Sequence, residues 1–372
     1  MNFNNNNNTS LSKKNLLYSS FNQINDCIIF GTNTGFYVYT LDPFKKIIAR
    51  KITGGVSIVK MLFKSNIILF VGNVEKGVYP NNKLIVWDDH KREVIGEISF
   101  KSKILNIELT KEIIIVVCSN KIYIYNFQNL VLVKSIETGE NLKGLCSISN
   151  EEHNLIAYPS NILGQIAITN IKSSNNKPET NYSINAHLSE LEIFNFDSSG
   201  KYIVSASEKG TLLRIFELEK TSLVKELRRG SDQVSIVDLK FSNNNKYLLC
   251  SSNRGTIHIF YTNLITISDT SENFDNSYNN IEEYNKHMGY GTWYFTDFLP
   301  QYFSSEWSFT QFYLTDIVSY SIFKNDTELI SIGNNGCFYH LGFNDNEPKI
   351  VSSIKFVSDE DDPFNDRTST IK

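Results

Sequence analysis

The sequence is poor in cysteine and in long apolar runs, and each shortage excludes a class of protein. Its 372 residues include five cysteines, an odd number with no Cys-x-x-Cys pair, which argues against a disulfide framework and a zinc site. The longest apolar run, Ile113–Cys118, is far shorter than the ~20 residues of a membrane-spanning helix. The Asn-rich residues 1–14 contain no apolar signal core. We therefore expect a protein of the cytoplasm.

The sequence also has no large net charge of either sign, and it lacks the common catalytic motifs. The net charge is −4, so general attraction to nucleic acid is not expected, and anion binding requires a local cluster. The chain has no P-loop, no Gly-x-Ser-x-Gly, no His-Glu-x-x-His and no EF-hand loop. Its six histidines do not recur at metal-ligand spacing. These absences favour a binding protein over an enzyme, and we expect this protein to hold no metal or cofactor.

What the chain does contain is a repeated β-strand pattern. A polar or Gly turn followed by alternating apolar residues recurs near Gly35, Lys83, Lys121, Gln165, Thr211, Thr256 and Cys337. The first six of these starts lie 38 to 48 residues apart, close to the ~40–45-residue period of a propeller blade. A second run suited to an outer strand follows each of them. The pattern predicts an all-β, seven-bladed propeller of WD40-like repeats, since an irregular sandwich would not explain the period.

The domain organisation follows from where this period holds. We expect the propeller to span residues 15–358, between an Asn-rich tail (1–14) and an acidic tail (359–372). The last spacing, 81 residues, predicts an insert in blade six at about 263–304. The first half of the insert is polar and acidic, which is typical of disorder. Its second half is aromatic, and helical spacing would gather these rings on a face suited to the membrane interface or to packing against the propeller.

Two adjacent arginines, Arg228 and Arg229, stand out within Leu227–Gly230. A guanidinium group is a permanently charged, planar donor that matches the oxygens of a phosphate. Neighbouring residues of a strand point to opposite sides, so the pair can serve two anion sites, one on each flank. The alternative is a solvated Arg-Arg-Gly turn.

Two similar phrases flank this pair. The preceding phrase supplies Ser205, Ser207, Thr211 and Arg214, and the following phrase supplies Ser252, Thr256 and His258. Hydroxyl, imidazole and guanidinium groups together suit a phosphate, because hydrogen bonds to charged groups contribute ~1.5–3 kcal/mol each. Thr256 and His258 share a strand face, whereas Thr211 and Arg214 do so only if a bulge intervenes. Taken singly, these hydroxyls are explained by turns and His258 by ordinary packing within a strand.

The stretches INAHLSELEIFNFDSSGKYIVSASEKGTLLRIF and LRRGSDQVSIVDLKFSNNNKYLLCSSNRGTIHIF resemble the PROPPINs, or WIPI proteins, a family of phosphoinositide-binding propellers. The hallmark of that family is Phe- or Leu-Arg-Arg-Gly between blades five and six. VYPNNKLIVWDDHKREVIGEI and LPQYFSSEWSFTQFYL are also similar to family stretches, the former to those of a shorter-chain subgroup. The resemblance covers nearly the whole chain outside the tails and the insert.

The resemblance implies a non-enzymatic effector that binds phosphatidylinositol 3-phosphate and the 3,5-bisphosphate at two sites on the propeller rim. The implied first site consists of His187, Ser205, Ser207, Thr211, Arg214 and Arg228. The implied second site consists of Arg229, Ser252, Thr256 and His258. Bilayer insertion by the blade-six insert is implied for Trp293, Phe295, Phe298 and Leu299.

The resemblance further implies a place of action and a protein partner. The place is the surface of autophagic, endosomal or vacuolar membranes, to which the protein would be recruited peripherally. The partner is the large lipid-transfer protein of autophagy, which would dock on blade two around Asn73–Asp89. No nucleic acid partner is expected. The alternative function is that of a WD-type scaffold that organises proteins without binding lipid.

Overall fold

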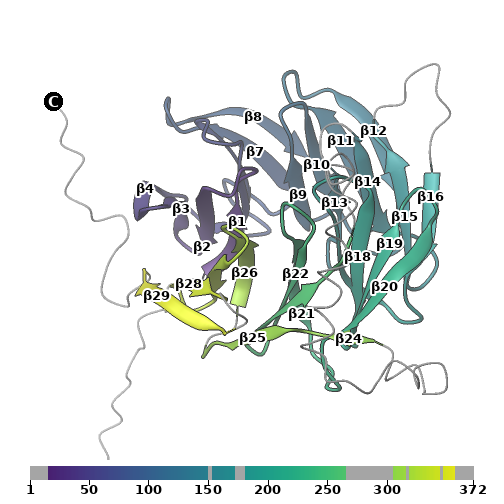
Figure 1. Cartoon of the computed structure of the whole chain (residues 1–372). Helices are drawn as coiled ribbons and strands as arrows, with labels where there is room; N and C mark the ends of the chain where they lie inside the picture. The colour runs from purple at the N-terminus through teal and green to yellow at the C-terminus, as the bar shows by residue number, and fades with distance from the viewer. Residues whose placement is uncertain are drawn as a thin grey trace, which may run out of the picture.

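The computed structural model describes residues 16–149, 153–171, 181–264, 305–315, 318–343 and 347–356. Within these ranges every regular element is a β-strand, and no helix is long and apolar enough to cross a membrane. The strands form seven sheets, which follow one another around an axis (Figure 1). The prediction of an all-β, seven-bladed propeller is therefore confirmed.

The first four blades each contain four antiparallel strands. Blade one consists of β1 (Leu16–Phe21), β2 (Cys27–Thr32), β3 (Gly35–Leu41) and β4 (Phe44–Lys51). Blade two consists of β5 (Val56–Met61), β6 (Ile67–Gly72), β7 (Lys83–Asp88) and β8 (Glu93–Ser99). Blade three consists of β9 (Asn106–Leu109), β10 (Ile113–Val117), β11 (Lys121–Asn126) and β12 (Leu132–Glu137). Blade four consists of β13 (Ser147–Ile148), β14 (Leu155–Pro159), β15 (Gln165–Asn170) and β16 (Asn181–Asn185).

Blades five and six differ from this scheme. Blade five consists of β17 (Leu191–Phe196), β18 (Tyr202–Ser207), β19 (Leu212–Glu217), β20 (Ser222–Arg228) and an added parallel strand, β24 (Glu306–Trp307). Blade six consists of β21 (Ile236–Phe241), β22 (Tyr247–Ser252), β23 (Thr256–Tyr261) and β25 (Thr310–Tyr313). Blade seven consists of β26 (Val318–Phe323), β27 (Glu328–Gly333), β28 (Cys337–Gly342) and β29 (Lys349–Lys355). The chain thus completes blade six only after the insert.

The seven sequence repeats correspond to the third strand of each blade. These strands are β3, β7, β11, β15, β19, β23 and β28. Second strands such as β2 and β22 are buried at every residue, whereas β29 at the rim is exposed throughout. A strand buried on both faces needs a continuous apolar run, and an outer strand does not. This difference explains why an outer strand such as β29 gives a weaker apolar signal in the sequence than the inner strands.

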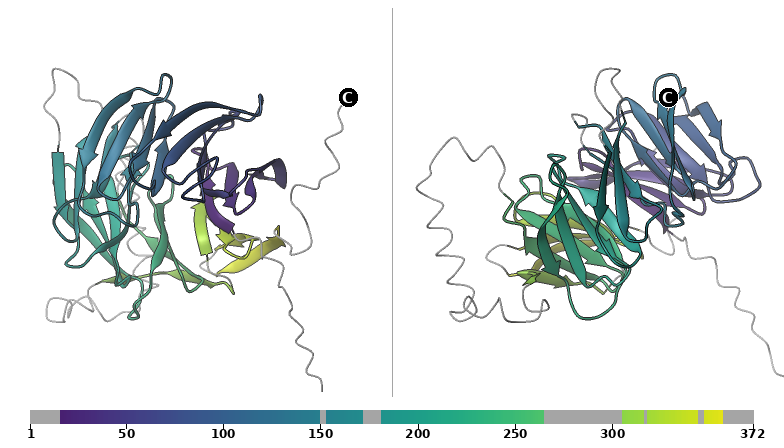
Figure 2. Two further views of the ribbon diagram at one scale, coloured as in Figure 1. Left: turned by 180° about the vertical axis from the view of Figure 1, so that it is seen from behind. Right: turned by 90° about the vertical axis from the view of Figure 1, so that its right-hand side faces the viewer.

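Blades one and seven close the ring without exchanging a strand. Their interface is aromatic: Phe44 stacks on Phe338 at 4.2 Å between ring centroids, and Phe356 lies 4.8 Å from Phe30. Figure 2 shows the purple strands of blade one beside the yellow strands of blade seven. Side-chain packing therefore joins the two ends of the propeller.

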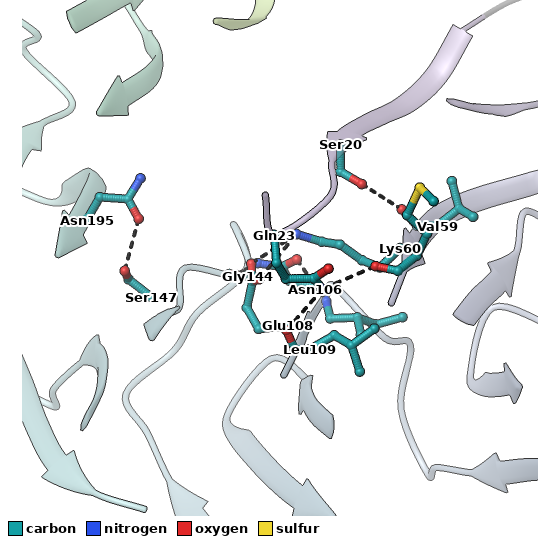
Figure 3. A network of polar contacts seen from close by, with 12 residues as sticks. Ser20, Gln23, Val59, Lys60, Asn106, Glu108, Leu109, Gly144, Ser147 and Asn195 are labelled. Atoms are coloured by element: carbon teal, nitrogen blue, oxygen red, sulfur yellow. Dashed lines mark hydrogen bonds and ion pairs between the residues drawn. The ribbon is translucent and has the colours of Figure 1, made fainter. Parts of the chain in front are cut away.

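Around the axis, polar contacts join the first strands of neighbouring blades (Figure 3). Lys60 Nζ on β5 lies 3.2 Å from Glu108 Oε2 on β9, and Ser147 Oγ on β13 lies 2.9 Å from Asn195 Oδ1 on β17. Ser20 Oγ on β1 donates to the Val59 carbonyl oxygen. Buried polar groups of this kind must be paired, so the contacts fix how adjacent blades sit against one another.

Candidate functional site

The two adjacent arginines lie at the end of β20, at the seam between blades five and six. Arg228 and Arg229 are only 8% and 7% exposed, so the alternative of a solvated turn is wrong. Burying a charge is costly unless the charge is hydrogen-bonded or paired. Burial also lowers the pKa of Arg229. Two buried cations at one seam therefore mark this place as a candidate anion site.

On the blade-five side, a row of polar residues crosses the sheet. Ser205 on β18 pairs with Arg214 on β19, which in turn pairs with Glu226 on β20. Cross-strand partners share a face, and Arg214 Nε accordingly donates to Glu226 Oε2 at 3.0 Å. Arg214 Nη1 donates to the Ala186 carbonyl oxygen at 2.7 Å. The Arg214 guanidinium is thereby oriented between blades four and five.

His187 joins this row from the loop between blades four and five. Its Nε2 lies 2.9 Å from Ser205 Oγ, and the residue is buried. Burial, and then the positive charge of Arg214, lower the pKa of His187 from 6.5 to about 4. The imidazole is therefore neutral at pH 7, and a bound anion would favour its charged form.

Three more residues predicted for the first site lie at one end of blade five. Ser207 ends β18, Thr211 lies in the turn before β19, and Arg228 ends β20. Gly210 shapes the turn with a φ of 61°, and a Cβ there would lie 2.0 Å from the Val234 carbonyl oxygen. Only glycine fits this tight turn. The turn brings the end of β18 and the start of β19 close to β20.

The bulge that would bring Thr211 and Arg214 to one face is not at the required place. The register irregularity between β19 and β20 lies at Ile215/Phe216, beyond Arg214. The Thr211 carbonyl oxygen instead accepts the Arg229 N–H at 2.9 Å. Arg214 therefore faces Ser205 and Glu226, while Thr211 contacts the arginine pair through its backbone.

On the blade-six side, two hydroxyl groups and an imidazole come from the ends of β22 and β23 that follow the Arg229 seam. Ser252 Oγ lies 2.6 Å from Thr256 Oγ1 across the Gly255 turn. His258 is buried, and its pKa falls from 6.5 to about 4 because of burial and then the Arg229 charge. Arg229 Nε donates to the Gly210 carbonyl oxygen at 2.5 Å.

Asp232 lies close to the second site, and its carboxylate forms an ion pair with Arg254. Its backbone carbonyl oxygen accepts a hydrogen bond from Arg229 Nη2. Its carboxylate lies 3.5 Å from Arg254 Nη1 at an exposed position. Surface ion pairs of this kind contribute little to stability. The Asp232 carboxylate therefore has its ion pair with Arg254 rather than with Arg229.

The comparison with protein families settles which propeller this is. The model of the PROPPIN family matches residues 15–333. The chain belongs to the PROPPIN family. It is 32% identical over 334 residues to "Autophagy-related protein 18e" of Arabidopsis thaliana, covering 88% of this chain and 83% of that protein. It is also 32% identical to "SVP1-like protein 2" of Pichia angusta, covering 90% of this chain and 87% of that protein.

A solved PROPPIN structure has the same architecture. Hsv2 of Kluyveromyces lactis superposes with a TM-score of 0.73 at 23% identity, covering 92% of this chain and 99% of Hsv2. At that identity the likeness shows the fold alone. PROPPINs are effector proteins whose family property is phosphoinositide binding, and the Atg18-like relatives are implicated in autophagy.

Three residues of the candidate site were not predicted from the sequence. Glu226 contacts Arg214, as described above, and Ser305 Oγ donates to Glu226 Oε1 at 2.9 Å. Ser308 Oγ lies 3.1 Å from His258 Nδ1. Strand alternation from Arg228 would have indicated Glu226, which lies two residues earlier. Ser305 and Ser308 follow the insert, where no spacing rule connects them to the site.

Some predicted features of this PROPPIN lie outside the described residues. They include the membrane-inserting Trp293, Phe295, Phe298 and Leu299, and both terminal tails. The blade-two region is described: Val74 and Pro80 form an isolated bridge, and Val78 between them is 66% exposed. An exposed aliphatic side chain on a short loop is available to a partner.

Proposed function

We propose that this PROPPIN binds phosphatidylinositol 3-phosphate and phosphatidylinositol 3,5-bisphosphate through two sites that share the Arg228–Arg229 seam. The observation that carries the proposal is the burial of both arginines at one seam, with a buried imidazole in contact with a hydroxyl group on each flank. Buried guanidinium and imidazole groups are poorly hydrated, so an anion that reaches them gains strong hydrogen bonds.

Each site has its own set of side chains. The first site contains His187, Ser205, Ser207, Thr211, Arg214 and Arg228, from blades four and five. The second contains Arg229, Ser252, Thr256 and His258, from the seam and blade six. Each set combines a permanent cation, hydroxyl donors and a histidine whose ring N–H can donate to an anion. These are the donors that a phosphorylated inositol ring requires.

Two sites on one rim favour a membrane over a soluble ligand. Once one head group is bound, the second site meets a high local concentration of the same lipid, so the combined affinity exceeds that of either site. This arrangement supports peripheral recruitment to membranes that carry these lipids. The Atg18-like relatives favour autophagic, endosomal or vacuolar membranes, and a role in autophagy or organelle trafficking there.

Flotation with liposomes that carry different phosphoinositides tests the proposal. We expect wild-type protein to float with the 3-phosphate and the 3,5-bisphosphate, and the Arg228→Thr, Arg229→Thr double variant to remain at the bottom. Lys45→Thr with Lys51→Thr on exposed positions of β4 removes the same charge elsewhere and should float normally. Flotation of the arginine variant at the wild-type level would contradict the site. Failure of the wild type to bind any phosphoinositide would favour the scaffold alternative.

We also propose that the large lipid-transfer protein of autophagy docks on blade two. The exposed Val78 within Asn73–Asp89 supports this surface. Val78→Asp should abolish binding of the purified partner in a pull-down while liposome flotation stays normal. Unchanged partner binding would exclude this loop as the docking surface.

A further inference from the structure

The chain that returns from the blade-six insert runs directly between the two candidate sites. We name Ser305–Ser308 the return arm. Its strand β24 pairs with β20, Leu227 with Glu306 and Arg228 with Trp307. Shortly afterwards β25 pairs with β23 of blade six, and Figure 1 shows β24 and β25 following one another along one edge of the molecule. Four residues thus pass from the edge of blade five to blade six beside the arginine pair.

At its first end, the return arm holds the carboxylate that orients Arg214. Ser305 is 6% exposed, and its Oγ donates to Glu226 Oε1 at 2.9 Å. The other oxygen, Oε2, accepts from Arg214 Nε at 3.0 Å. A guanidinium has five N–H donors. The contacts with Glu226 and the Ala186 carbonyl occupy only Nε and Nη1, so Arg214 is oriented while Nη2 keeps its donors for a ligand.

At its other end, the return arm contacts the imidazole of the second site. Ser308 Oγ accepts a hydrogen bond from Gln311 Nε2 at 2.9 Å and lies 3.1 Å from His258 Nδ1. With its oxygen accepting from Gln311, the hydroxyl has its own proton to donate to Nδ1. A neutral histidine that accepts at Nδ1 carries its proton on Nε2. His258 then offers Nε2–H as a donor.

A single lysine holds both ends of the insert at this place. Lys225 Nζ donates to the carbonyl oxygens of Tyr261 and Thr262, where the chain leaves blade six. The same ammonium lies 2.9 Å from Glu306 Oε2 on the return arm. Its side chain is 11% exposed, so this ion pair is screened less than a surface pair. Lys225 therefore fixes the arm to the end of β23.

We propose that the return arm is a positioning element of both head-group sites: through Glu226 it sets Arg214 in the first site, and through Ser308 it sets the Nε2–H tautomer of His258 in the second. This inference rests on the proposed function, since it assigns roles within the same two sites. Strand β24 lies on blade five before the chain completes blade six at β25. The base of the insert and the two sites then form one unit.

The test uses two variants, each of which keeps only one of the two sites intact. Arg229→Thr keeps the first site, and Arg228→Thr keeps the second. The probe is soluble inositol 1,3-bisphosphate, measured by calorimetric titration. Losing one hydrogen bond that orients a ligand-binding side chain should weaken the affinity for the probe about five-fold or more. We expect Ser305→Ala to weaken only the first site, Ser308→Ala only the second, and Lys225→Met both. Ser308→Thr, which keeps the hydroxyl, should retain wild-type affinity.

A spectroscopic readout separates positioning from simple loss of stability. Nitrogen chemical shifts of His258 should show the Nε2–H tautomer in the wild type and a mixture of tautomers in Ser308→Ala. Ser222→Ala, at the exposed far end of β20, serves as the matched control and should change neither the tautomer nor the affinity. Thermal unfolding confirms that each variant folds.

Wild-type affinity in both Ser305→Ala and Ser308→Ala, or an equal loss at both sites from either one, would overturn the inference. An unchanged His258 tautomer in Ser308→Ala would also overturn it. Failure of the wild type to bind any head group would instead refute the proposed function. The tautomer measurement needs no ligand, so it would still decide whether Ser308 positions His258.

Discussion

At the scale of single residues, the two buried histidines are the most sensitive groups of the candidate site. His187 and His258 each have a pKa lowered from 6.5 to about 4, mainly by burial and then by a neighbouring arginine. Both are neutral at pH 7, and folding disfavours their charged forms. The adjacent Arg228 and Arg229 were the clearest signal in the sequence, but the sequence left a solvated turn open, and only their burial excludes it.

These lowered pKa values predict a loss of stability in mild acid. The histidines of the unfolded chain bind protons from about pH 6.5 downward, whereas those of the folded chain do not. The stability that each neutral histidine contributes is therefore fully present above pH 6.5 and is lost toward pH 4. Between pH 7.5 and 5 we expect a loss of ~2 kcal/mol in unfolding free energy for each histidine. Urea denaturation at the two pH values measures it.

The His187→Gln, His258→Gln double variant should flatten this dependence, and the exposed His90→Gln should leave it unchanged. An equally steep loss of stability in the double variant would show that other groups cause it.

At the scale of elements, the sequence predicted strands better than contacts between distant segments. The third strand of every blade was visible because it alternates behind a polar turn, and the insert was visible as an excess in one spacing. The partnership of β24 with β20 was not predictable. A two-residue strand has no pattern of its own, and its parallel pairing depends on how the chain returns after the insert. Ser305 and Ser308 were missed for that reason.

The insert itself supplies a prediction at this scale. Replacing Trp293, Phe295 and Phe298 by Ser should reduce flotation roughly ten-fold or more, because large aromatic side chains supply much of the energy of binding at a membrane interface. Binding of soluble inositol 1,3-bisphosphate should remain at the wild-type level, since these residues belong to neither head-group site.

A matched control replaces Val131, Leu132 and Val133 by Ser, three exposed aliphatic residues on and beside β12 of blade three. This variant should float normally. Equal losses of flotation and of soluble head-group binding in the aromatic variant would show that its rings belong to the propeller core.

At the scale of the whole molecule, the ring depends on packing where its two ends meet. Because blades one and seven share no strand, the aromatic cluster around Phe44 and Phe338 carries the closure. The blade count followed from the sequence period. The manner of closure did not, because it depends on which rings from opposite ends of the chain come into contact.

Phe338→Ala should therefore lower the free energy of unfolding by about 3–5 kcal/mol, the cost of removing a buried aromatic ring and leaving a cavity. Phe338 is 4% exposed. Ile350→Ala on the outer strand β29, at a residue that is 51% exposed, should change stability by no more than ~0.5 kcal/mol. Urea denaturation measures both variants. A loss below ~1 kcal/mol in Phe338→Ala would mean that closure does not depend on this cluster.

The central claim, that one arginine pair serves two separate head-group sites, is tested most directly by the stoichiometry of binding. Calorimetric titration with soluble inositol 1,3-bisphosphate should give two bound ligands per wild-type chain, one each for Arg228→Thr and Arg229→Thr, and none for the double variant. One ligand per wild-type chain, lost completely in either single variant, would contradict the account and show a single shared site.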